Sequence, residues 1–153
     1  MIEDALTFYD NIKIDKTKIE TILGYKYDNI DSMSDIELSK CCIVLAQYLI
    51  YFRWQINKAK KEQTVLKNKM DSVIFHTLSE DIIKKYKTKS DARSYLVNSI
   101  PDLLNINEQI NNIEYELILS DGLEKPIQEM INVLKREQTR REAELALSKT
   151  ERR

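Results

Sequence analysis

The residues that could carry out catalysis are few and scattered along this chain of 153 residues. The one histidine, His76, has only Lys69 and Asp71 as charged residues shortly before it, whereas a catalytic triad or a metal site needs several convergent partners. The two glycines are isolated, so the chain has no glycine-rich loop for phosphates. We therefore predict that the protein is not an enzyme, has no metal site and uses no cofactor.

Cationic and aromatic side chains recur at helical spacing in the middle of the chain. Arg53, Lys60 and Lys67 are seven residues apart, which places them in one row on a helix. A neighbouring row consists of two aromatic residues and two lysines: Tyr51, Trp54, Lys58 and Lys61. Cations neutralise phosphates and flat rings stack on bases, so this combination is typical of a surface that binds a single strand of nucleic acid.

A further group of cations follows between residues 79 and 100, and it extends the predicted interface. The complete set of predicted contacts with single-stranded DNA is Arg53, Trp54, Lys58, Lys60, Lys61, Lys67, Lys69, Lys84, Lys85, Lys87, Lys89 and Arg93. The alternative is that the lysines only keep a coiled coil soluble, while Trp54 packs beneath the N-terminal segment. Because affinity grows with the number of phosphates neutralised, tight binding would need several copies of the chain.

The charges are segregated along the chain, although the formal net charge is −1. Counted by segment, the net charge is −4 for residues 1–40, +6 for 41–100, −6 for 101–134 and +3 for 135–153. The local field, rather than the total charge, steers a charged partner. Near-neutrality therefore excludes neither a polyanion nor an acidic protein as a partner.

A single long helix over residues 34–78 is predicted to position the cationic rows. Apolar residues recur at alternating gaps of four and three, interrupted by Gln63 and Thr77, as in a coiled-coil seam. The seam comprises Leu38, Cys42, Leu45, Leu49, Phe52, Ile56, Ala59, Gln63, Leu66, Met70, Val73 and Thr77. Ser34 followed by Glu37 predicts a capping box at the start of this helix.

A second seam over residues 101–134 predicts the partner of the long helix. It begins at Pro101 and comprises Leu103, Ile106, Ile110, Ile113, Leu117, Ser120, Glu124, Ile127, Ile131 and Leu134. Pro126 cannot donate a hydrogen bond to the carbonyl of Gly122, so a kink or break is expected there. With only two glycines and two prolines, a β-rich fold is disfavoured. We predict an all-α protein built on a long antiparallel helical hairpin.

The remaining segments complete one predicted domain over residues 1–153. Residues 1–33 form a small helical cap, with short helices over 2–9 and 17–23, the second ended by Gly24 and followed by a loop to Met33. Residues 79–100 form the basic connection of the hairpin, with a mobile tip and a short helix capped by Ser90. Residues 135–153 form a charged tail that frays or binds a partner.

The first half of the long helix is apolar nearly all round, which indicates cover on more than one side. One explanation is burial beneath the N-terminal cap, another is self-association, and the two are compatible. The predicted oligomer interface comprises Ile43, Val44, Ile50, Tyr51 and Trp54.

Several features predict a cytoplasmic protein that does not span a membrane. The longest apolar run, residues 41–52, is too short to cross a bilayer, and the N-terminus opens acidic rather than basic. The adjacent Cys41 and Cys42 are best explained as reduced thiols. Binding to a membrane surface is less favoured, because the apolar and basic parts follow one another in sequence instead of occupying opposite faces.

The run Tyr51-Phe52-Arg53-Trp54, followed by Asn57-Lys58, Lys60-Lys61-Glu62 and Leu66-Lys67, resembles the middle of UvsY-type recombination mediators of tailed phages. The similarity of pattern extends over residues 36–145. It implies a hexamer or heptamer that binds single-stranded DNA and helps a RecA-like recombinase displace single-strand-binding protein. It also implies a phage protein located in the cytoplasm of a bacterial host. The DNA-binding motif of the family falls on residues 58–69, where Lys67-Asn68-Lys69 replaces its Lys-x-Arg doublet.

Overall fold

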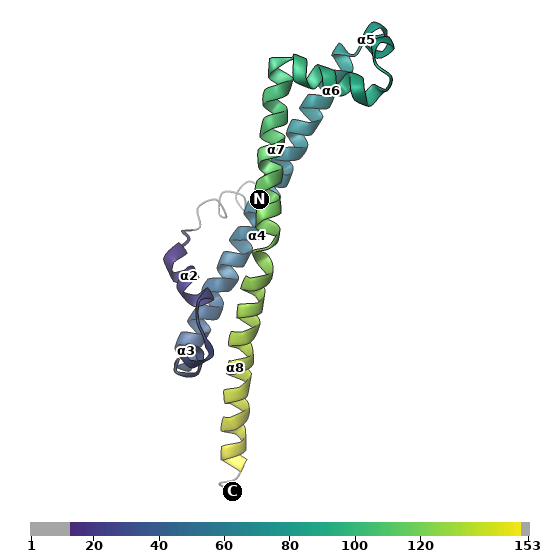
Figure 1. Cartoon of the computed structure of the whole chain (residues 1–153). Coiled ribbons are helices and arrows are strands. Elements are labelled where there is room, and N and C mark those ends of the chain that lie inside the picture. Colours follow the sequence, from purple (N-terminus) through teal and green to yellow (C-terminus); the bar gives the residue numbers. More distant parts are fainter. Residues whose placement is uncertain (1–12, 151–153) are drawn as a thin grey trace, which may run out of the picture. The chain divides into compact units, whose positions relative to one another are not determined.

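The protein is all-α, as predicted, in a computed structural model that describes residues 13–150 (Figure 1). No strand occurs within that range. Its helices are α2 (Lys16–Leu23), α3 (Tyr27–Asp31), α4 (Asp35–Thr77), α5 (Glu80–Lys85), α6 (Lys89–Ser99), α7 (Pro101–Asp121) and α8 (Glu124–Thr150). The helix predicted for residues 2–9 lies outside the described residues.

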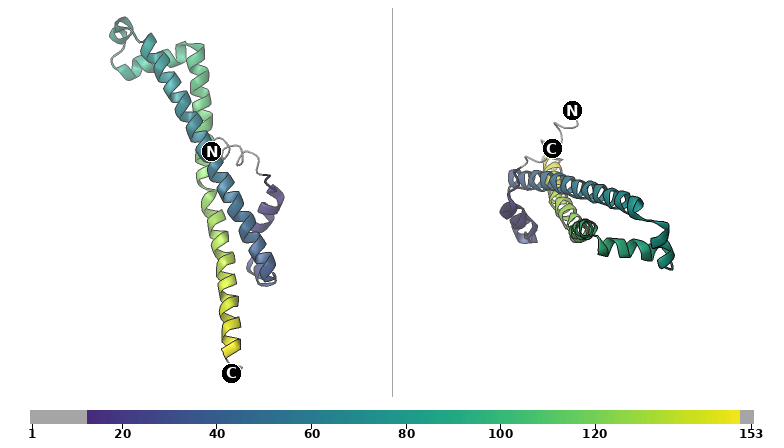
Figure 2. Two further views of the ribbon diagram at one scale, coloured as in Figure 1. Left: turned by 180° about the vertical axis from the view of Figure 1, so that it is seen from behind. Right: turned by 90° about the horizontal axis from the view of Figure 1, so that it is seen from above.

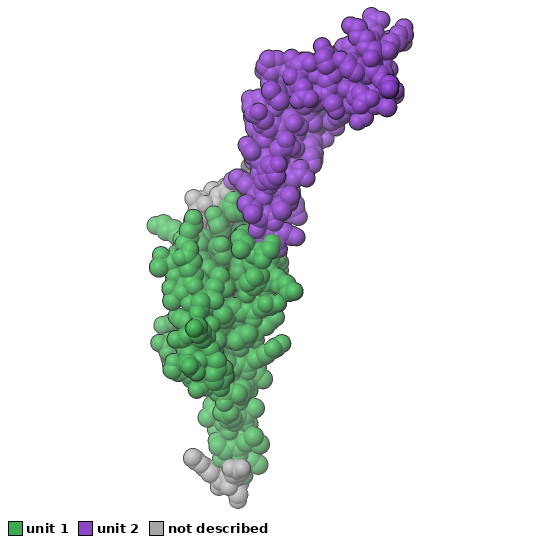
Figure 3. All heavy atoms as spheres, in the orientation of Figure 1, with its two compact units in different colours: residues 1–55, 122–153 green, residues 56–121 purple. Residues whose placement is uncertain are grey.

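The chain divides into two compact units (Figure 3). Unit 1 comprises Met1–Gln55 and Gly122–Arg153, and unit 2 comprises Ile56–Asp121. Helix α4 contributes its first half to unit 1 and its second half to unit 2. The prediction of a single domain remains a prediction.

The core of unit 1 lies between α8, the first half of α4 and the two short helices α2 and α3 (Figure 2). Its buried members are Ile19, Ile22, Ile30, Leu38, Cys41, Leu45, Leu49, Ile127, Ile131 and Leu134. Within unit 1, α4 and α8 are antiparallel, as two contacts between them show. Gln138 donates to Ser39 Oγ at 2.9 Å, whereas Arg53, later in α4, pairs with Glu124 at the start of α8.

The core of unit 2 lies between the second half of α4 and helices α6 and α7. Its buried members are Met70, Ile74, Leu96, Val97, Leu103, Ile106 and Ile110. Ten of the seventeen buried residues in the two cores come from the two predicted seams. On α4, two buried residues lie beside the predicted seam: Cys41 is more deeply buried than Cys42, and Ile74 is buried where Val73 is only half-buried. Cys41 gains its burial because α2 and α3 cover that side of α4.

The predicted start of the long helix is confirmed. Glu37 Oε2 accepts from the Ser34 backbone N–H at 2.8 Å, and Ser34 Oγ accepts from the Glu37 backbone N–H at 3.3 Å, which is a reciprocal capping box. These bonds to Ser34 lower the pKa of Glu37 below 4.5. Helix α4 then continues without interruption to Thr77.

The N-terminal cap matches its prediction only in part. Helix α2 does end before Gly24, but Gly24 has a φ of −84°, so the helix closes without the left-handed residue usual at this position. The loop predicted up to Met33 is wrong, because residues 27–31 form α3. A side-chain bond starts this helix: Asn29 Oδ1 accepts from the Lys26 backbone N–H at 2.9 Å, and Ile30 is buried.

The connection predicted over residues 79–100 consists of two helices: the short helix expected in its second part is confirmed as α6, whereas α5 was not predicted. Ser79 Oγ accepts from the Ile82 N–H at the start of α5, and Thr88, not Ser90, caps α6 through the Asp91 N–H. Ala92, Leu96 and Val97 bury one face of α6. Helix α5 was missed because its six residues are too few to show a helical period.

The break predicted near Gly122 and Pro126 is confirmed. Helix α7 ends at Asp121 and α8 begins at Glu124, so Pro126 lies in the first turn of α8. A missing N–H costs little there, because first-turn donors have no partner within the helix.

The segment predicted as a tail is helical to Thr150, and its first part is attached to the N-terminal region of unit 1. Arg141 uses all five of its N–H donors: Nε donates to Glu137, Nη1 to Asp35 and the Met33 carbonyl, and Nη2 to the Ile30 and Asp31 carbonyls, over 2.6–3.2 Å. These bonds attach α8 to the end of α3 and the start of α4. The expectation of fraying is therefore wrong for this part of the segment.

Candidate nucleic-acid interface

Besides Lys58, four predicted contacts on the second half of α4 are solvent-exposed lysines in unit 2. They are Lys60, Lys61, Lys67 and Lys69. None forms an ion pair with any residue between 13 and 150. A lysine with a water-exposed ammonium gains most from a phosphate, because it gives up no internal partner on binding.

The two predicted arginines are ion-paired within the chain. Arg53 donates through Nε at 2.7 Å and Nη2 at 2.5 Å to Glu124 Oε1, within unit 1. Arg93 donates to Asp71 Oδ1 at 2.5 Å, within unit 2. Both pairs are partly exposed, so each holds its arginine only modestly. Contacts of these two arginines with DNA remain predictions.

Trp54 is half-buried, and both Trp54 and Lys58 take part in interactions within the chain. Tyr51 is half-buried as well. The two explanations for Trp54, stacking on bases and packing beneath the cap, therefore both remain open. Lys58 itself is exposed.

The second predicted group lies on α5, on α6 and on the connection between them. Lys84, Lys85, Lys87 and Lys89 are exposed, and Lys84 lies 3.9 Å from Glu80, a weak pair one turn away. Tyr86, at the end of α5, packs against Tyr95 of α6 with ring centroids 5.1 Å apart and an interplanar angle of 31°. Loss of water around the Tyr86 hydroxyl raises its pKa. Sequence reasoning did not select Tyr95, because no periodicity relates residues of two separate helices.

Unit 2 contains ten acids and ten bases, and half of the acids lie on α7, apart from the bases. All ten bases lie on α4, α5, α6 or the connection between α5 and α6, and the last of them is Arg93. Helix α7 carries five acids and no base. The acids of α7 are Asp102, Glu108, Glu114, Glu116 and Asp121. Tyr115, Ile118 and Leu119 on the same helix are 66%, 63% and 76% exposed. Helix α7 therefore presents an acidic and apolar surface, which is unsuited to DNA.

The residues of the predicted oligomer interface differ in their exposure to solvent. Ile43 and Ile50 are 57% and 49% exposed, whereas Val44 packs partly against the core of unit 1. Ile36, which the prediction omitted, is 68% exposed and lies seven residues before Ile43. The three isoleucines thus form one exposed apolar row on α4, called here the isoleucine row. Self-association through it remains a prediction.

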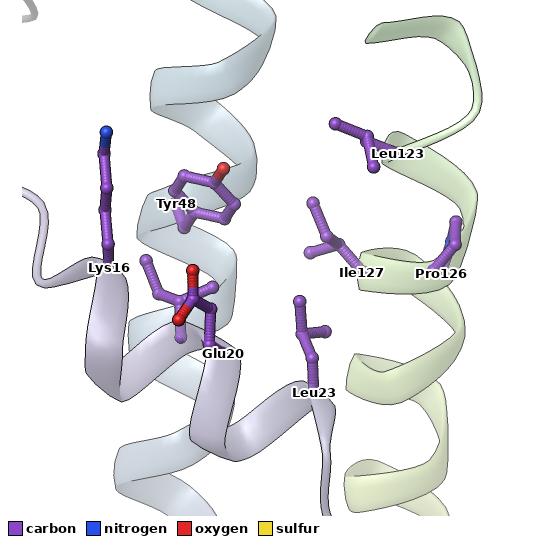
Figure 4. Close-up of a pocket in the computed structure, with 8 residues that line it drawn as sticks. Lys16, Glu20, Leu23, Tyr48, Leu123, Pro126 and Ile127 are labelled. Carbon is purple, nitrogen blue, oxygen red and sulfur yellow. The ribbon is translucent and has the colours of Figure 1, made fainter. Parts of the chain in front are cut away.

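The cavity in Figure 4, of about 310 Å³, lies within unit 1 and is mainly apolar. It is lined from α2, α4, α8 and the turn before α8 by Lys16, Ile19, Glu20, Leu23, Tyr48, Leu123, Pro126 and Ile127. Lys16 and Glu20 supply its only charges. Across residues 13–150, no three or more histidine, cysteine, aspartate or glutamate side chains are grouped so that they could hold a metal ion.

Comparisons with known proteins add no identification: no family model, no curated protein and no solved structure matches this chain. None of the described helices combines the length and apolarity that a membrane crossing requires.

Proposed function

We propose that this protein is a non-enzymatic recombination mediator that binds single-stranded DNA. In this role it helps load a RecA-like recombinase onto DNA coated by single-strand-binding protein. The observation that carries the proposal is the set of exposed lysines Lys60, Lys61, Lys67 and Lys69, without ion-pair partners among the described residues. The resemblance around Trp54 supports it. The long hairpin and its assembly into a hexamer or heptamer are parts of the same proposal.

The protein partners would use a surface different from the one that binds DNA. Helix α7 repels phosphates through its five acids, and it exposes Tyr115, Ile118 and Leu119 within about one turn. Exposed apolar side chains beside charges of one sign suit a protein partner of opposite charge. The recombinase and the single-strand-binding protein are therefore proposed to contact α7 rather than the lysines.

The experiment is a salt titration of DNA binding, followed by the fluorescence anisotropy of labelled oligo-dT. The variant Lys60→Ala/Lys61→Ala/Lys67→Ala should lose at least tenfold in affinity at low salt. The slope of log K against log salt should fall by about 2, since each phosphate contact on a single strand contributes about 0.7. Undetectable or salt-independent binding by the natural chain would end the proposal.

A matched variant separates this effect from a general change in charge. Lys13, Lys16 and Lys18 are also exposed, but they lie on the N-terminal cap of unit 1. The variant Lys13→Ala/Lys16→Ala/Lys18→Ala should bind DNA nearly as the natural chain does. Equal losses in the two triple variants would mean that only the total charge matters. Circular dichroism of both variants checks that helicity is retained.

The alternative function is a coiled-coil interaction or structural adaptor of a phage, without nucleic-acid binding. It is favoured by the exposed apolar residues, namely the isoleucine row and the surface of α7. Trp54, the one tryptophan in the chain, distinguishes the two functions. Strong quenching of its fluorescence by oligo-dT favours the mediator, whereas an unchanged, blue-shifted emission favours the adaptor.

A further inference from the structure

Helix α5 is held in place by few contacts, and an aromatic pair is prominent among them. The helix has six residues and none of them is buried. Ile82 packs at the edge of the unit 2 core, and Tyr86 packs against Tyr95. The ring pair and Ile82 are therefore contacts that hold α5, with Lys84 and Lys85, against the rest of unit 2.

Tyr95 has more exposed surface than a purely structural ring would need. It keeps 48% of its surface in contact with water, although Tyr86 covers one side at a centroid distance of 5.1 Å. An exposed aromatic ring whose orientation is fixed by a neighbour offers a flat surface at little entropic cost on binding. Such a surface suits an unpaired base, which stacks on aromatic rings whatever its identity.

Cations surround this ring pair closely enough to bind the backbone of the same strand. Lys87 and Lys89 follow Tyr86 by one and three residues, so their Cα atoms lie within about 11 Å of the Tyr86 Cα. Both lysines are exposed and form no ion pair with a described residue. The nearest acid on α6 is Asp91, one turn before Tyr95, and α5 begins with Glu80 and Asp81. The four lysines at 84, 85, 87 and 89 outnumber these three acids.

We infer that Tyr95, supported by Tyr86, is a base-stacking site, and that Lys87 and Lys89 bind the phosphates beside the stacked base. The inference rests on the proposed function, and it adds what sequence reasoning did not supply: an aromatic contact on α6, in unit 2. Binding at this site depends on the presence of bases, whereas binding by lysines alone depends only on phosphates.

The test compares two probes, labelled oligo-dT and an oligonucleotide of equal length built only from abasic sites. Tyr95→Ala should weaken binding of oligo-dT by about 5- to 150-fold, the effect of losing one stacked base. It should change the affinity for the abasic probe less than twofold. Tyr95→Phe should bind both probes as the natural chain does, since stacking does not need the hydroxyl. Lys87→Ala/Lys89→Ala should weaken the binding of both probes and lower the slope of log K against log salt by about 1.4.

Tyr115→Ala is the matched control, because Tyr115 is an exposed tyrosine of the same unit on the acidic helix α7. It should leave both affinities unchanged. Equal binding of oligo-dT by Tyr95→Ala and the natural chain overturns the inference and leaves the proposed function intact. If Tyr95→Ala weakens the binding of both probes equally, the inference is overturned too, because the ring would then only position α5. If the natural chain binds neither probe, the proposed function fails first and the inference fails with it.

Discussion

At the scale of single residues, Glu137 is the most strongly perturbed acid in the described chain. It is 8% exposed and accepts hydrogen bonds from both Arg140 and Arg141. These bonds lower its pKa from 4.5 to about 2. The charged carboxylate holds Arg141 in the geometry that reaches α3 and α4, so it supports the packing of α8 on the cap.

The pH dependence of stability follows from that shift. Because folding lowers the pKa of Glu137, its contribution is complete above about pH 4.5 and is lost as the pH falls toward about 2. We expect the melting temperature to fall through this range and to fall less steeply in Glu137→Gln. Thermal melts followed by circular dichroism measure both. Parallel pH profiles for the two proteins would contradict the assignment, because Glu37, whose pKa is also lowered, is present in each.

Sequence reasoning predicted the exposure of the candidate interface lysines better than it predicted the contacts of their neighbours. Exposure of Lys60, Lys61, Lys67 and Lys69 follows from their positions off the apolar seam, so the sequence could predict it. The pairing of Arg53 with Glu124 and of Tyr86 with Tyr95 could not be predicted. These contacts join residues on different helices, and their formation depends on tertiary packing that no local period encodes.

At the scale of elements, the long periodic segments were predictable and the two shortest helices were not. The period of α4 predicted its ends to within about one residue, because more than five repeats and a capping box agree. Helices α3 and α5 are five and six residues long, too short to show a helical period. Their presence depends on one side-chain cap each, from Asn29 and Ser79.

The break between α7 and α8 gives a prediction for Pro126. Pro126→Ala supplies the N–H that the Gly122 carbonyl lacks, and Gly122→Ala adds a methyl group that meets no atom within 4 Å. The double variant should therefore extend regular helix through residues 122–123. We expect slower amide hydrogen exchange over residues 121–127 and slightly higher ellipticity. Gly122→Ala alone, which leaves the proline, should show less protection. Unchanged exchange in the double variant would place the cause of the break elsewhere.

At the scale of the whole molecule, the number of copies decides whether DNA binding is useful. The second half of α4 offers four exposed lysines without ion pairs to described residues, and few phosphate contacts give weak binding at physiological salt. An oligomer multiplies those contacts on one strand, and the second contact is then made at high effective concentration. Assembly and DNA affinity should consequently change together.

The isoleucine row provides the test of that connection. Ile43→Glu/Ile50→Glu places two carboxylates on the exposed face of α4 without touching the described core. We expect light scattering to show a mass near the 18.1 kDa of one chain, and oligo-dT affinity to fall together with the salt slope. Val65→Glu, at a 56% exposed position on the same helix, should keep the assembled mass. If the double variant stays assembled, the row is not the interface. If it dissociates and binds DNA unchanged, a single chain is sufficient for binding.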